Sequence, residues 1–357
     1  MKITKITVQP ITIEYKRGFT TAYGLERKTI HVLIQMFTDE GIVGLGEAAP
    51  LEDFTGENYL TIERLLKGDF ERTLIGMNPF DHALIHSKLN QTPGNPAAKS
   101  AVDIALWDIM GKTLNRPIHS LLGGKYRSRI ETAEVIGIDE PAEMAEAAVD
   151  LKRQGFRTIK MKVGSRNVKL DAERVASVRG AIGSKVNLRV DANNSYSVEK
   201  AIQLGRKIKK HDLAYIEQPV AAANIKGLAK VRRTVGIPIT ADESVHNAMD
   251  ALKVVKHDAA DFLAIKFAKC GGICEAKTIT RIAELAGLKC VIISAFEVGV
   301  GLAADTQVAA TSPSVELPCE IAIGPMYEDK FTTGILNHIT YLDVSDKPGL
   351  GVELLNH

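Results

Sequence analysis

The sequence contains no long run of charged residues of one sign. Among its 357 residues, 45 are Lys or Arg and 43 are Asp or Glu, so the formal net charge is only +2. Proteins that bind nucleic acid or anionic membranes usually carry a basic stripe or patch. The balanced charge therefore argues against both kinds of partner.

Long hydrophobic runs are also absent. No uninterrupted apolar stretch reaches the length of about 18 residues that predicts a membrane-spanning helix, and the N-terminus alternates like a strand instead of forming a secretory signal. Cysteine is scarce, with four in the chain, which fits a reducing cytosol, so we expect a cytoplasmic protein. Cys270 and Cys274 lie in "CGGIC", but no His or second Cys pair lies nearby, which argues against zinc.

The rest of the chain shows two patterns of secondary structure. Residues 1–50 have the pattern of strands with a turn at Asp39-Glu40-Gly41, and residues 55–115 are helical. We therefore predict an α+β domain over residues 1–125. Beyond residue 130, short apolar strands alternate with helical segments.

Eight strands are expected in this second part: "IETAEVIGI", "TIKMKVG", "VNLRVDAN", "LAYIEQP", "IPITADES", "DFLAIKFA", "LKCVIISAF" and "SVELPCEI". Their alternation with helices predicts a parallel (β/α) barrel. An open doubly wound sheet is the alternative, but such a sheet often has a glycine-rich phosphate loop after its first strand. The segment "VIGIDEPAE" is no such loop.

Charged residues recur at one height of the expected strands. Asp191, Glu217 and Asp242 end successive strands, and Lys266 lies on the next, at intervals of 26, 25 and 24 residues. Since the C-terminal strand ends of a barrel form its active-site rim, three carboxylates should meet there. They would repel one another, and a hard divalent ion removes that conflict. We predict one Mg²⁺ per chain on these carboxylates; strand-end capping paired with lysines is the alternative.

Lys160 and Lys162 point to the same face because they are two residues apart on one strand. Lys162 and Lys266 should lie across the barrel from each other, on opposite faces of the α-carbon of a metal-bound carboxylate. Such a pair can remove and return an α-proton. Lys160 is expected to lower the pKa of Lys162 by repulsion, or to bind a substrate carboxylate.

Together these motifs resemble the enolase superfamily, in its muconate-lactonising subgroup. The matching segments are "KMK", "VDANNSY", "IEQP", "ADES" and "AIKFAKCGGI" in the barrel, with "DEGIVGLGEAAP" and "AKSAVDIALWDIMGK" before it. The resemblance covers nearly the whole chain. It implies a modified TIM barrel, (β/α)₇β, over residues 126–325, with an α+β capping domain formed by residues 1–125 and completed by residues 326–357.

The resemblance also implies a chemistry. It implies Mg²⁺ on Asp191, Glu217 and Asp242, and acid/base roles for Lys162 and for Lys266 in preference to Lys269. Members of the subgroup racemise or epimerise amino-acid derivatives and dipeptides, cycloisomerise muconate, or dehydrate carboxylates, always after removing an α-proton. We expect a racemase or epimerase, with cycloisomerase or syn-dehydratase as alternatives. A non-catalytic barrel would lack a ligand or lysine, and none is missing.

Substrate recognition is less defined. Dipeptide epimerases place an Asp-x-Asp pair on the eighth strand, where this chain has Cys319-Glu320-Ile321, which argues against a free-amine dipeptide. Glu320 is the acidic residue there. Glu297, expected at the barrel rim, would either replace this recognition or be a surface residue.

The loop "RGFTTAYGLER" has the small residues of a lid. Phe19 and Tyr23 in it would contact substrate or pack against the cap, and Asn193 would support a metal ligand. The ligand of the site is a small-molecule carboxylate. Relatives of this kind are commonly homo-oligomers, so we expect at least a symmetric dimer.

Overall fold

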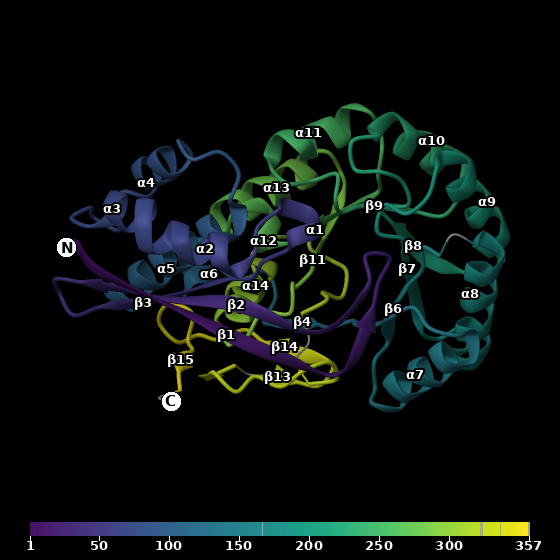
Figure 1. Ribbon diagram of the computed structural model, residues 1–357, viewed down its shortest axis with the longest axis horizontal. Helices are drawn as coiled ribbons and strands as arrows, with labels where there is room; N and C mark the ends of the chain where they lie inside the picture. Colours follow the sequence, from purple (N-terminus) through teal and green to yellow (C-terminus); the bar gives the residue numbers. More distant parts are fainter. Residues whose placement is uncertain (166, 322–323, 336, 356–357) are drawn as a thin grey trace.

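The computed structural model describes residues 1–165, 167–321, 324–335 and 337–355. Figure 1 shows a cap, in purple and blue, beside a curled sheet that is covered on its outside by helices in teal and green. The last part of the chain, in yellow, runs beneath both. None of the helices in these ranges combines the length and apolar character that crossing a membrane requires.

The cap is an antiparallel sheet with helices on one side. Its strands are β1 (Ile3–Thr20), β2 (Leu25–Thr38) and β3 (Val43–Ala48), in that order. Helix α5 (Pro96–Thr113) packs directly on β3, because a Cβ on Gly44 or Gly46 would lie within 2.3 Å of α5 carbonyl oxygens. The other helical segments are α1 (Glu52–Thr55), α2 (Tyr59–Leu65), a π-helix (Leu66–Phe70), α3 (Glu71–Leu74), α4 (His82–Leu89) and α6 (Ile118–Leu121).

The barrel sheet has seven parallel strands, each next to its neighbour in sequence. They are β5 (Glu134–Ile136), β6 (Thr158–Lys162), β7 (Asn187–Asp191), β8 (Leu213–Glu217), β9 (Ile239–Ala241), β10 (Phe262–Ile265) and β11 (Lys289–Ile292). Bridges from Ile293 to Glu320 and from Thr132 to Cys319 place the eighth strand between β11 and the start of the sheet. The (β/α)₇β prediction is therefore confirmed.

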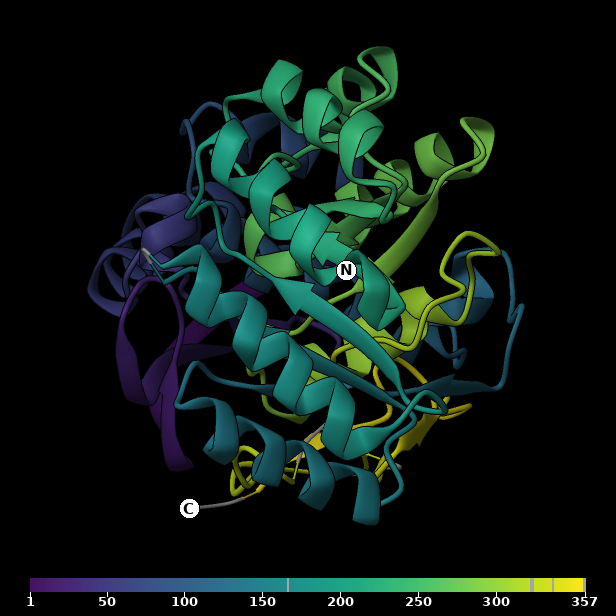
Figure 2. The same cartoon turned by 90° about the vertical axis from the view of Figure 1, so that its right-hand side faces the viewer.

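Helices connect these strands and form the outer layer, several of them side by side in Figure 2. They are α7 (Pro141–Arg153), α8 (Val168–Ile182), α9 (Val198–Ile208), a 3₁₀ turn (Lys209–His211), α10 (Ile225–Val235), α11 (Ala248–Lys256), α12 (Phe267–Cys270), α13 (Ile273–Leu285) and α14 (Gly299–Ala309). Asn167, Ser197, Asn224 and Asn247 cap the starts of α8 to α11 by accepting backbone N–H groups.

The C-terminal segment contacts both domains. Strands β13 (Asn337–His338) and β14 (Tyr341–Asp343) extend β4 (Arg129–Glu131), and β12 (Thr332–Thr333) pairs with β15 (Glu353–Leu354). The backbone N–H of Lys16 donates to the carbonyl of Met326 at 2.8 Å, and that of Leu350 donates to Asp108 at 2.9 Å. The C-terminal segment therefore contacts the cap through Lys16 and Asp108, and pairs with β4 at the start of the barrel domain.

Candidate active site

The ends of the central strands bring the predicted charges together. Lys162, Asp191 and Glu217 are neighbours across β6, β7 and β8, in register. The backbone N–H of Asp242 donates to Gln218 Oε1 at 2.9 Å, which fixes the end of β9 against that of β8. Every residue of β6 is buried, including both of its lysines. The regular spacing in the sequence thus corresponds to one layer of side chains.

A cavity of about 450 Å³ opens over this layer. Lys160, Lys162 and Lys266 line it from the barrel side. Lys162 Nζ lies 2.6 Å from Asp191 Oδ2, and Lys266 Nζ lies 2.5 Å from Asp242 Oδ2. The two lysines thus come from opposite parts of the sheet, and each is paired with a different carboxylate.

The carboxylates have the charge pattern of a cation site. Burial, and next the charge of Asp191, raises the pKa of the Glu217 carboxyl well above its ordinary value. Burial alone would also raise the pKa of Asp191, but Lys162 and Lys160 hold it at about 2. The pKa of Asp242 is likewise lowered by Lys266 and Lys269 in spite of burial. A buried, mutually repelling set of oxygens fits Mg²⁺, which prefers carboxylate ligands.

Lys160 lies on the floor of the cavity. Its Nζ is 3.3 Å from both Asp191 Oδ2 and Glu217 Oε1, and it also forms an ion pair with Glu320. Burial lowers its pKa, but Glu217, Glu320 and Asp191 raise it well above the ordinary value. Lys160 is therefore a cation held by three carboxylates.

The protein groups around Lys266 do not give it the lowered pKa that a neutral lysine base needs. Burial lowers its pKa, but Asp242, followed by Glu217 and Glu243, raises it above the ordinary value. Lys269 is fully buried beneath, where its Nζ lies 2.7 Å from Asp242 Oδ1 and 3.1 Å from the carbonyl of Ala264.

The β1–β2 hairpin reaches from the cap to the barrel (Figure 1). At its tip, the Tyr23 hydroxyl donates to Glu243 Oε1 at 3.0 Å and accepts from Asn194 at 2.9 Å. Phe19 and Tyr23 both line the cavity, and Phe19 also packs edge-on against Phe296. The ring of Phe54, in α1, lies over Lys266, with Nζ 4.4 Å from the ring centre. The cap therefore covers the cavity mouth.

Asn193, two residues beyond the end of β7, contacts the layer of charged side chains. Its Oδ1 accepts from Lys162 Nζ at 2.9 Å, and its Nδ2 donates to Glu243 Oε1 at 3.1 Å. Its own N–H donates to Asp191 Oδ1 at 3.0 Å. Asn193 thus links the lysine to the first carboxylate.

The structure corrects the interpretation of Glu297. Its side chain is buried, so it is not a surface residue, and it is missing from the described residues that line the cavity, although Ser294, Ala295 and Phe296 are among them. Its Oε2 accepts the N–H of Ala295 at 2.6 Å instead. The preceding residue, Phe296, lines the cavity and has a positive φ of 68°.

The eighth-strand window also needs correction. Glu320 lines the cavity, whereas Cys319 and Ile321 belong to the hydrophobic core, as alternation along a strand requires. The two positions compared with the aspartates of dipeptide epimerases, Cys319 and Ile321, therefore do not face the cavity, and Glu320 between them does. Glu320 accepts from Tyr215 at 3.2 Å and pairs with Arg189 at 3.3 Å in addition to Lys160.

Other acidic residues of the cavity were missed from the sequence. Glu134 on β5 is buried, and its Oε2 has no hydrogen-bond partner among the described residues. Burial raises its pKa to about 7. Glu26 and Asp53 lie at the mouth, where burial and then Asp53 raise the pKa of Glu26. Glu26 lies in the segment expected to form the lid, and Glu134 lies in the expected first strand, so both could have been considered from the sequence.

Comparison with known proteins defines the family. Residues 3–123 match the model of the mandelate racemase / muconate lactonizing enzyme N-terminal domain, and residues 143–357 match the enolase C-terminal domain-like model. The chain belongs to this family of the enolase superfamily. Its membership of the muconate-lactonising subgroup, inferred from the motifs, is confirmed.

Three relatives illustrate the range of its members. The N-succinyl-L-Arg/Lys racemase of Bacillus cereus is 36% identical, over 99% of this chain and 96% of the relative. Muconate cycloisomerase 1 of Rhodococcus opacus is 30% identical, over 90% and 88%. The substrate-liganded L-Ala-D/L-Glu epimerase of Bacillus subtilis superimposes with a TM-score of 0.96, at 32% identity and over 100% of both chains. All are isomerases, and so is this enolase-superfamily member.

Proposed function

We propose that the protein is a Mg²⁺-dependent racemase or epimerase that moves the proton α to the carboxylate of an amino-acid derivative or dipeptide. The observation that carries this is the placement of Lys162 and Lys266, which reach one cavity from opposite parts of the barrel. Reprotonation on the face opposite to proton removal needs two such groups. Relatives with racemase and epimerase activity support the same reaction.

Asp191, Glu217 and Asp242 would hold the ion. When bound, Mg²⁺ neutralises charge that develops on the substrate carboxylate. Lys162 and Lys266 then exchange the α-proton, one from each face, while Asn193 keeps Lys162 in place through its hydrogen bond. Lys160 adds a fixed positive charge below the substrate carboxylate. The Tyr23 and Phe54 side chains exclude water from above.

The mouth of the cavity favours a substrate with a positively charged group. Asp53 lies close enough to Glu26 that its charge, after burial, raises the pKa of the Glu26 carboxyl. Inside the cavity, Glu134 Oε2 has no hydrogen-bond partner among the described residues. A cation between Glu26 and Asp53 would relieve their repulsion, and an N–H donor on the substrate would satisfy Glu134. We therefore expect N-acyl derivatives of basic amino acids, or dipeptides with basic side chains, to be preferred. This accords with the relative that acts on N-succinyl-Arg/Lys.

A screen in D₂O tests the reaction class. N-acyl amino acids, dipeptides, proline derivatives and muconate are incubated with enzyme and Mg²⁺, and α-deuterium incorporation is followed by NMR and mass spectrometry. Deuterium with inversion of configuration is expected for an N-acyl amino acid or a dipeptide. Lactone formation from muconate without such exchange would instead identify a cycloisomerase. We further expect a cytoplasmic homo-oligomer, at least a symmetric dimer.

A further inference from the structure

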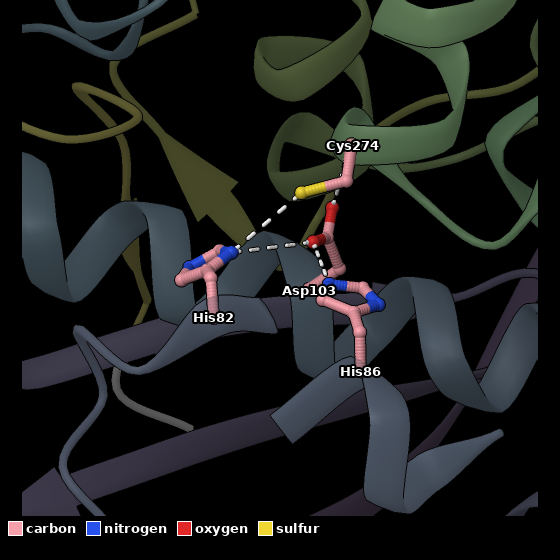
Figure 3. A group of neighbouring side chains, drawn as sticks. All are labelled: His82, His86, Asp103 and Cys274. Atoms are coloured by element: carbon pink, nitrogen blue, oxygen red, sulfur yellow. Dashed lines mark hydrogen bonds and ion pairs between the residues drawn. The ribbon is translucent and has the colours of Figure 1, made fainter. Parts of the chain in front are cut away.

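Four potential metal ligands meet where the cap touches the barrel. His82 and His86 lie one turn apart on α4, so they face the same side of this helix, Asp103 comes from α5, and Cys274 comes from the first turn of α13. Figure 3 shows all four side chains pointing toward one another. One nitrogen, oxygen or sulfur atom from each lies within 4.8 Å of those from the others.

The distances resemble those of a tetrahedral site. Zinc bonds of about 2.0–2.3 Å separate neighbouring ligand atoms by about 3.3–3.8 Å. His82 Nδ1 lies 3.6 Å from Cys274 Sγ and 3.8 Å from Asp103 Oδ1. His86 Nε2 is closer to Asp103 Oδ1, at 2.6 Å, because these two form a hydrogen bond. This hydrogen-bonded pair must separate for an ion to lie between all four residues.

Asp103 is held in the orientation that a ligand needs. Its Oδ2 accepts the backbone N–H of Ile273 at 2.6 Å and that of Cys274 at 3.2 Å, which leaves Oδ1 facing the histidines. Gly272 allows this approach, since a Cβ there would lie 2.5 Å from Oδ2. Hydrogen bonds of this kind to the far oxygen are typical of metal-ligating carboxylates.

Charge and access also suit an ion. The Asp103 side chain is fully buried, whereas those of His82 and His86 are 15% and 24% exposed, so the site is open to solvent on the histidine side. A divalent ion would neutralise the thiolate and carboxylate together.

We propose that His82, His86, Asp103 and Cys274 form a zinc site that fastens the cap to the barrel. Imidazole and thiolate ligands select zinc over Mg²⁺, so this site is chemically distinct from the three carboxylates of the barrel. On binding, Cys274 releases its thiol proton to solvent as the sulfur–zinc bond forms. The site lies outside the cavity and does not depend on the proposed reaction.

Cobalt provides a spectroscopic test. The full-length protein is stripped with a chelator, given excess Mg²⁺ to fill the carboxylates, and titrated with Co²⁺. Binding of one Co²⁺ per chain should give the intense visible absorption of a tetrahedral site and a thiolate-to-cobalt charge-transfer band, and Zn²⁺ should displace both. Absence of the charge-transfer band in the wild-type protein would overturn the proposal without any variant.

Matched variants identify the ligands. Cys274→Ser should lose the charge-transfer band, whereas Cys270→Ser, which removes the neighbouring cysteine outside the cluster, should keep it. Zn²⁺ should raise the melting temperature of the wild type and of Cys270→Ser but not of His86→Asn, which removes the ring nitrogen that faces Asp103. We expect zinc affinity to fall in His86→Asn by more than roughly 100-fold, because loss of a group that only hydrogen-bonds to a ligand lowers metal affinity by roughly 10–100-fold. Unchanged cobalt spectra in Cys274→Ser would show that the thiolate belongs to another site.

Discussion

Lys160 and Glu217 face each other inside the barrel, with Nζ 3.3 Å from Oε1 and 3.4 Å from Oε2. Glu217 is fully buried, and the charges of Asp191, Glu320 and Asp242 raise its pKa further. The charge of Lys160 opposes this increase in the pKa of Glu217. Glu217 is therefore surrounded by several carboxylates and one buried ammonium group. The buried negative charge around Glu217 supports the proposal that this residue holds a divalent ion.

Glu217→Gln should weaken Mg²⁺ binding more than about 10-fold and reduce activity in parallel, because Gln keeps the size of the side chain but removes its charge. Isothermal titration with Mg²⁺ and turnover at saturating Mg²⁺ measure the two effects. Glu316→Gln, at an exposed position, is the control and should leave both unchanged. Undiminished Mg²⁺ affinity in Glu217→Gln would remove Glu217 from the ligand set.

The sequence was sufficient to predict the barrel and its charged layer, because one strand–helix unit recurs about every 25 residues and each unit carries its charge at the same height. Side-chain direction beyond a strand end was not predictable. Phe296 has a positive φ, and the side chain of the next residue, Glu297, is buried in the protein interior and not in the cavity.

Contacts between the cap and the barrel were also outside what the sequence could show. Cys274 appeared isolated because its neighbours in space, His82 and His86, are nearly two hundred residues away in the chain. Only the docking of α4 and α5 on α13 brings them together. Likewise, the acidic residues at the cavity mouth come from different elements of the cap, Glu26 from β2 and Asp53 from α1, and no local sequence pattern relates them.

Asp305, on α14, should make stability depend on pH. It is 1% exposed, and neither carboxyl oxygen has a partner among the described residues. Burial, and next the charges of Glu297 and Glu47, raises its pKa well above the ordinary value. Above about pH 4 the unfolded chain loses this proton while the folded chain keeps it, so folding stability falls by up to about 1.4 kcal/mol per pH unit.

Asp305→Asn should remove this contribution. Urea unfolding between about pH 5 and pH 8 should show that the variant loses less stability than the wild type as the pH rises, so the difference between them changes with pH. Asp150→Asn, at an exposed position, should run parallel to the wild type. Parallel curves for Asp305→Asn would mean that Asp305 is ionised in the folded protein.

Glu26→Gln should change the choice of substrate. If Glu26 and Asp53 attract a cationic side chain, kcat/KM for N-succinyl-arginine should fall about 10-fold, while that for N-succinyl-norleucine should stay the same or rise, since a charge-assisted contact contributes about 1.5 kcal/mol or more. Glu14→Gln, on the same hairpin but exposed outside the cavity, is the matched control. An equal loss for both substrates would assign Glu26 to catalysis or lid closure instead of recognition.

The two lysines should act on opposite configurations of one substrate. In D₂O, Lys162→Ala should lower α-proton exchange from one stereoisomer by about 10²–10⁴-fold and leave measurable exchange from the other, and Lys266→Ala should do the reverse, since general acid/base catalysis contributes about that factor. Lys67→Ala, at an exposed cap position, should exchange both isomers normally. A one-sided elimination or cycloisomerisation would give a different pattern, in which one variant loses all exchange and the other retains it while turnover falls. Full exchange of both isomers in either single variant would show that the base is another lysine, and Lys160 and Lys269 would be the next to replace.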